Sequence, residues 1–196
     1  MIGRLTVFFA ALAVILSATV ARATSIAPVT IHDLLKESDV AVVVHIMSGV
    51  EETYSVPVYK AKVTQALKGA TSGAELFLGG CTGLSIGEDY LVFLKRGDSV
   101  DPNKLRQALS YGRIPLLYRV MYSGYSVMEI EYACVFNGAE PSDRCQHAVK
   151  LNPEQILLPK SITTFPAGDA GPITNYKKWV RESELLEVLQ RFAHES

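Results

Sequence analysis

Short segments in which apolar residues run together or alternate with polar ones follow each other along much of the chain, and this pattern predicts β-strands. Residues 39–48 form a β-branched apolar run that predicts a central strand. Residues 54–67 predict a long second strand, in which Pro57 requires an edge position or a bulge. Further strands are predicted at 75–78, 89–95, 116–122 and 126–136. In the last of these, the apolar positions from Met128 to Phe136 recur with a period of two, as in a half-buried strand.

Helical patterns occur near the two ends of this set of strands, and residues 102–109 predict one or two helical turns between the strands. Thr30 and Asp33 form a capping pair before a short helix that we expect to end at Ser38. Residues 161–175 are rich in Pro, Gly and Thr and predict a linker. Residues 176–194 predict an amphipathic helix that docks on the same domain, with a membrane-surface or partner helix as the alternative. Its apolar stripe consists of Trp179, Leu185, Leu186, Leu189 and Phe192.

Short antiparallel strands of uneven length, with helices only at the margins, predict a mainly β protein. A small barrel and a sandwich both fit this pattern. Apolar residues make up 48% of the chain and charged residues 20%, as in an ordinary globular protein. The 19 Lys and Arg against 20 Asp and Glu leave a net charge of −1, so no basic excess favours a nucleic-acid partner.

The first 23 residues have the layout of a secretory signal peptide. Arg4 is the only early charge, an apolar stretch follows from Leu5 to Leu16, and 21–23 is an Ala-Arg-Ala end. The alternative, an uncleaved anchor, is disfavoured because the apolar stretch is shorter than the roughly 20 residues that a membrane span needs. We therefore expect cleavage after Ala23, a secreted or periplasmic location, and no membrane span in the mature protein.

Three cysteines remain in the predicted mature chain, and an oxidising compartment permits disulfides. Cys134 and Cys145 flank a segment with turn-forming residues, so a disulfide between them is expected to stabilise the protein by about 2–3 kcal/mol. Cys81 is then left over. A buried thiol is the interpretation we favour, and a reactive or intermolecular thiol is the alternative.

Motifs of the common enzyme classes do not occur in the sequence, and the four histidines have no zinc-ligand spacing. A Cys81 thiolate with His45 or His147 is the best available enzyme hypothesis, but the spacing supplies neither a base nor an orienting group. Glu129 and Glu131 could act as paired carboxylates, although exposed strand positions explain them better. The sequence thus predicts no catalytic residue, no cofactor and no enzymatic activity.

Several segments, in order and spacing, resemble the N-terminal domain of the tissue inhibitors of metalloproteinases (TIMPs), within the netrin-like module family. The resemblance covers about 24–97 of the chain. The matching segments are 24–29, 39–43, 59–63, 67–69, 81–87 and 90–93. It implies a five-stranded OB-fold-like closed barrel, and we assign residues 24–160 to this domain, followed by the linker and the C-terminal helix.

In that family the free N-terminus binds the zinc of a target protease. The resemblance therefore implies that the backbone amine and carbonyl of Thr24 chelate a partner's zinc and that the side chain of Ser25 enters its specificity pocket. Thr24 and Ile26 replace two cysteines of the family, and Cys81 matches the family's partner for the first of them. We expect a secreted binding module that binds or inhibits a zinc metalloprotease, or, alternatively, a structural or ligand-binding module with no protease target.

Overall fold

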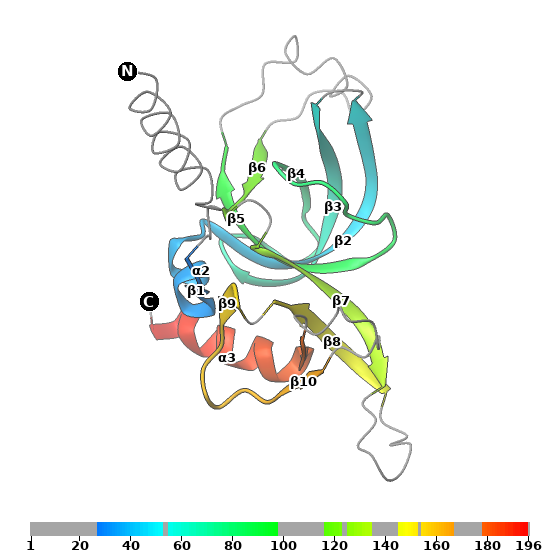
Figure 1. Ribbon diagram of the computed structural model, residues 1–196. Helices are drawn as coiled ribbons and strands as arrows, with labels where there is room; N and C mark the ends of the chain where they lie inside the picture. Colours follow the sequence, from blue (N-terminus) through cyan, green and yellow to red (C-terminus); the bar gives the residue numbers. More distant parts are fainter. Residues whose placement is uncertain are drawn as a thin grey trace, which may run out of the picture.

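The computed structural model describes residues 27–52, 55–97, 116–122, 125–134, 145–152, 154–166 and 178–195. Within these ranges the protein is mainly β, with a barrel at one end and a helix-covered sheet at the other (Figure 1). The elements in chain order are β1 (Val29–Thr30), α2 (Ile31–Glu37), β2 (Val40–Glu52), β3 (Ser55–Lys68), β4 (Glu75–Gly79), β5 (Asp89–Arg96), β6 (Leu117–Val120), β7 (Val127–Cys134), β8 (Cys145–Leu151), β9 (Ile156–Leu157), β10 (Thr164–Pro166), β11 (Lys178–Arg181) and α3 (Glu182–Glu195).

Five strands close into a barrel, which confirms the predicted OB-fold-like architecture. Their order is β2-β3-β4-β6-β5, and β5 pairs back with β2 to complete the circle. The β4–β6 pairing is parallel and the other four are antiparallel. Closure leaves the barrel strands without a continuous free edge, which removes the usual site of edge-to-edge aggregation.

The sheet does not stop at the barrel, because β5 has two partners on the same side. Its first half, Asp89–Val92, pairs with β7, and its second half, Leu94–Arg96, pairs with β6. From β7 the sheet continues through β8 and β11 to β10, and we call these four strands the sheet extension. Helix α3 packs against β8 and β11 of this extension, and α2 lies beside α3 (Figure 1).

Two hydrophobic cores share the strands β2 and β5. In β2, Val40, Val42 and Val44 point into the barrel, whereas Ala41 and Val43 point into the layer between the sheet and the helices. All five are buried. In β5, Leu91 and Phe93 belong to the helix-layer core, and Val92 and Leu94 belong to the barrel core. This burial on both faces accounts for the continuous apolar run in the sequence.

Helix α2 begins and ends with side chains that satisfy its free backbone groups. The Thr30 side chain accepts a hydrogen bond from the Asp33 backbone N–H at 3.0 Å and donates one to the Asp33 carboxylate at 2.6 Å. The predicted capping pair is therefore confirmed. At the other end, Lys68 Nζ on β3 donates to the carbonyls of Leu35 and Lys36 at 2.8 and 3.0 Å. These contacts tie α2 to the barrel.

Pro57 lies in β3 outside the pairing with β4, which agrees with the predicted edge position or bulge. In the described part of the chain, β4 pairs with β3 only from Tyr59 to Lys62, so Pro57 lies beyond the end of that pairing. The register between β2 and β3 shifts close to the same place, between Val50 and Glu52. Strand β2 itself runs through to Glu52, four residues beyond the predicted end at residue 48.

The predicted linker contains a short strand, its residues 167–175 lie outside the described ranges, and the C-terminal helix begins later than predicted. Within 161–175, Thr164–Pro166 forms β10, and the first part of 176–194 forms β11, which pairs with β10 and β8. Trp179 and Val180 favour a strand, and their alternation brings Val180 into the helix-layer core. The helix begins only at Glu182, where acidic residues occupy its first turn.

Helix α3 docks on the same domain, as expected. It buries Leu185, Leu186, Val188 and Leu189 in the helix-layer core, beside α2 and β8. Neither helix in the described ranges is long and apolar enough to cross a membrane.

Candidate functional site

A cavity of about 290 Å³ lies where the barrel meets the sheet extension. One wall is the loop 81–84, which follows β4, together with Tyr90 of β5. Further wall residues come from 127–129 on β7, which pairs with β5, and from 150–152 at the end of β8. Tyr125, and Gln155 and Ile156 at the start of β9, complete the lining. The cavity thus collects residues from segments that are far apart in the sequence.

Cys81 is one of the buried residues of the cavity wall, with 8% of its surface exposed. Burial raises the pKa of its thiol to about 11, so the thiol is neutral at physiological pH. A reactive cysteine would need the opposite shift, towards the thiolate. The preferred interpretation as a buried thiol is therefore supported, and Cys81 packs with the barrel core.

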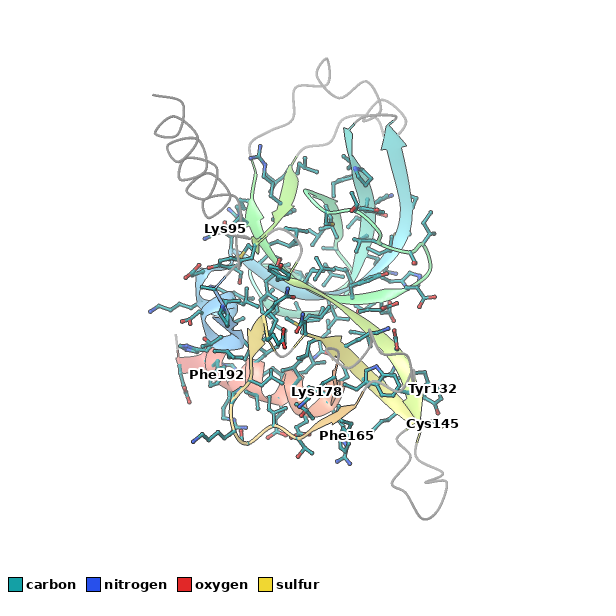
Figure 2. The ribbon with its side chains drawn as sticks, in the orientation of Figure 1. Lys95, Tyr132, Cys145, Phe165, Lys178 and Phe192 are labelled. Carbon is teal, nitrogen blue, oxygen red and sulfur yellow. The ribbon has the colours of Figure 1, made fainter. Side chains whose placement is uncertain are left out.

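The two histidines that could have activated Cys81 are engaged elsewhere. His45 Nδ1 lies 2.8 Å from Asp89 Oδ1 on the barrel surface. The His147 ring packs edge-on against Tyr132, with 5.5 Å between centroids. No histidine lies among the described residues that line the cavity. Tyr132 is 67% exposed near the outer end of the β7–β8 pair (Figure 2), so our expectation of a half-buried strand fails there.

Two tyrosine hydroxyls hold the loop that follows Cys81. The Leu84 backbone N–H donates to the Tyr59 hydroxyl at 3.3 Å, and the Ser85 N–H donates to the Tyr90 hydroxyl at 2.9 Å. Both rings belong to the barrel core. The cavity wall is therefore fixed by groups that are themselves buried, which favours a preformed site.

The charged groups of the site are two carboxylates that share one lysine. Lys150 Nζ on β8 forms an ion pair with Glu131 on β7, and it lies 3.6 Å from Glu129 Oε2. Burial works to raise the pKa of Glu131, but the hydrogen bond and the charge of Lys150 outweigh it and lower that pKa. Burial raises the pKa of Glu129, and the neighbouring Glu131 adds to this effect. Of the three, Glu129 and Lys150 line the cavity.

The N-terminal strand lies beside the cavity. Val29 pairs in parallel with Ile156, and its backbone N–H donates to the Gln155 carbonyl at 2.9 Å. In a parallel pair the two chains enter from the same end, and Gln155 and Ile156 belong to the cavity wall. Strand β1 therefore lies against two residues of the cavity wall.

Thr24, Ser25 and Ile26, the predicted binding residues, lie outside the described residues, as does the predicted signal peptide 1–23. Only Cys81 of that predicted set can be located, and it lines the cavity. Within the described ranges, no group of three or more His, Cys, Asp or Glu side chains could hold a metal ion.

Cys134 and Cys145 are direct register partners at the ends of β7 and β8. Opposite Cα atoms in an antiparallel pair are about 4.5–5.5 Å apart, which is within the range that a disulfide spans. Figure 2 shows Cys145 at the outer tip of the β7–β8 pair, remote from the helices.

Comparison of the chain with protein-family models and with curated proteins found no match in either set. The TIMP resemblance therefore remains a hypothesis. Cys81, Glu129 and Glu131 were recognisable from the sequence, whereas Lys150 and the cavity were not predicted. The alternation along 145–151 was the available signal, because it places Lys150 on the face opposite the buried Val149.

Proposed function

We propose that this protein is a secreted, non-catalytic TIMP-like OB-fold module that binds or inhibits a zinc metalloprotease through its mature N-terminus. The parallel pairing of β1 with β9, at the edge of the Cys81 cavity, carries this proposal. Cleavage after Ala23 would leave Thr24 five residues before Val29. An extended stretch of that length spans at most about 18 Å, so the new terminus would lie within about 18 Å of Val29, whose strand partner Ile156 lines the cavity.

The proposed chemistry needs only backbone atoms. A neutral amine nitrogen and a carbonyl oxygen at Thr24 can occupy an open position on a catalytic zinc, and the Ser25 side chain would enter the neighbouring pocket of the protease. The fixed loop 81–84 would add contacts beside the terminus. The high pKa of Cys81 supports a packing role for this thiol in such a module, and not a nucleophilic one.

We further propose that Cys134 and Cys145 form a disulfide, which their register favours. It would close the β7–β8 pair and stabilise the sheet extension by about 2–3 kcal/mol. Mass spectrometry of unreduced peptides would identify the bond, and recovery of both residues as free thiols from exported protein would contradict it.

The experiment compares exported protein that begins at Thr24 with protein carrying one additional alanine before Thr24. The chelating amine would move by one residue, so we expect inhibition of a susceptible zinc metalloprotease to weaken at least tenfold. Ile86→Ala serves as the matched control, because this exposed loop residue lies outside the described cavity wall. Equal inhibition by the extended and the unextended protein would reject the mechanism.

A structural or ligand-binding module without a protease target is the second candidate. Thr24 and Ile26 stand where the family has cysteines, so the two-residue strand β1 replaces a covalent tether. Less preorganisation means lower affinity for a rigid partner. Recovery of a stable partner that is not a protease, together with no effect on any zinc protease tested, would favour this candidate.

A further inference from the structure

We propose that the Cys81 cavity receives the cationic side chain of an arginine or lysine from the protein partner. This inference rests on the proposed function, because it assigns a chemistry to the binding surface beside the mature N-terminus. It concerns the partner's side chain and not the zinc, so it can be tested separately.

The charge of the site favours a cationic ligand. Two carboxylates share one ammonium group, which leaves a net charge of −1 on the cluster of Glu129, Glu131 and Lys150. The lysine forms its closer contact with Glu131, which does not line the cavity. Glu129 does line it, and its 3.6 Å separation from Lys150 Nζ is longer than a hydrogen bond. A cation in the cavity would complete the pairing of Glu129.

The electrostatics of the described wall agree with this assignment. Burial, with Glu131 beside it, raises the pKa of Glu129; the charge of Lys150 lowers it but does not cancel the rise, which is the direction expected for a carboxylate whose charge is only partly balanced. Cys81 is neutral at physiological pH. Glu129 and Lys150 are the charged groups among the described residues of the wall.

The lining and volume of the cavity fit one long side chain with an apolar stem. The wall also contains apolar side chains at Leu84, Val127, Met128 and Ile156. Arginine and lysine carry apolar stems that pack along such surfaces while the charged head reaches a carboxylate. A volume of about 290 Å³ is at the lower limit of ligand pockets, which favours one long side chain over a large molecule.

The test titrates exported protein with three acetylated and amidated tripeptides, Gly-X-Gly, in which X is arginine, citrulline or norleucine. Amide chemical shifts report the binding. We expect saturable shifts at 127–129 and 150–152 with the arginine peptide, and at least tenfold weaker binding of the two neutral peptides. Glu129→Gln should weaken arginine binding at least tenfold, whereas Lys150→Gln should strengthen it several-fold.

Glu75→Gln is the matched control, because it removes the same charge from the Lys60–Glu75 ion pair, outside the described cavity wall. It should leave arginine binding unchanged. Equal binding of arginine and norleucine, or an unchanged affinity in Glu129→Gln, would overturn the proposal. Binding that requires removal of residues 24–26 would also overturn it, since the cavity would then belong to the chain's own terminus. The titration involves no protease. Arginine binding can therefore be detected if the zinc-chelation proposal fails, and protease inhibition can be detected if arginine does not bind.

Discussion

Leu91→Ala and Leu94→Ala form a matched pair that tests whether the two cores unfold as one unit. The two leucines lie three residues apart on β5 and are fully buried, but Leu91 packs in the helix-layer core and Leu94 in the barrel core. Because β2 and β5 contribute to both cores, damage to either core should be transmitted to the other through these strands.

Each substitution should lower the free energy of unfolding by about 3 kcal/mol, within the range of about 2–5 kcal/mol for a buried Leu→Ala change. For a domain of this size that corresponds to a decrease in Tm of roughly 6–12 °C. Ile86→Ala, at a side chain that is 62% exposed, should change stability by less than about 0.5 kcal/mol.

Urea unfolding followed by two probes is the assay. The single tryptophan, Trp179, lies on β11 and reports on the sheet extension, whereas far-ultraviolet circular dichroism reports on all strands. We expect the two transitions to coincide in the unmodified protein and in both variants. If Leu91→Ala shifted only the fluorescence transition, the barrel and the extension would be independent units and the reasoning would be wrong.

Two further predictions concern a thiol and a glycine. The raised pKa of Cys81 should make its alkylation by iodoacetamide at pH 8 about 100-fold slower than for a thiol with the ordinary pKa of 9.0, measured on the Cys81 peptide by mass spectrometry. Because the pKa of the Cys81 thiol is higher in the folded than in the unfolded protein, its contribution to the free energy of unfolding is fully present below about pH 9 and is lost as the pH rises through about 11. Cys81→Ala should abolish this part of the pH dependence of the urea midpoint. Gly69→Ala should cost more than the about 1–2 kcal/mol of Gly73→Ala, because both have positive φ but only the Gly69 Cβ would meet a backbone atom, the Asp39 carbonyl oxygen at 2.0 Å. Equal melting temperatures of these two variants would contradict the clash.

The first helix and the barrel strands were predictable because their signals are local, whereas the closed barrel was expected only from the TIMP resemblance, since the pattern alone also fitted a sandwich. The capping pair at Thr30 and the valine run from 40 to 44 specify their own conformation, whatever they later contact. The sheet extension depends on distant partners instead. Residues 178–181 share apolar spacing with the helix that follows, and only their pairing with β8 makes them a strand. The spacing of apolar residues does not reveal which distant strand a segment will pair with.

The same difference between local signals and distant partners holds for the candidate site. Cys81 could be singled out by counting cysteines. The cluster of Glu129, Glu131 and Lys150 depends on the register of β7 against β8, which no local pattern determines. The cavity also needs the start of β9, which is held there by a two-residue pairing with β1. Sites assembled across several chain segments are therefore invisible until the topology is known.

The change of partners along β5 limits where the chain can vary in length. One extra residue near Val92 would turn every later side chain of the strand to the opposite layer and misalign three neighbouring strands at once. The outer half of the β2–β3 ribbon is different, since its ladder already contains two irregular steps, between Ile46 and Ser48 and between Val50 and Glu52, that can absorb an inserted residue. Relatives of this chain should therefore keep β5 at constant length and differ in the β2–β3 ribbon.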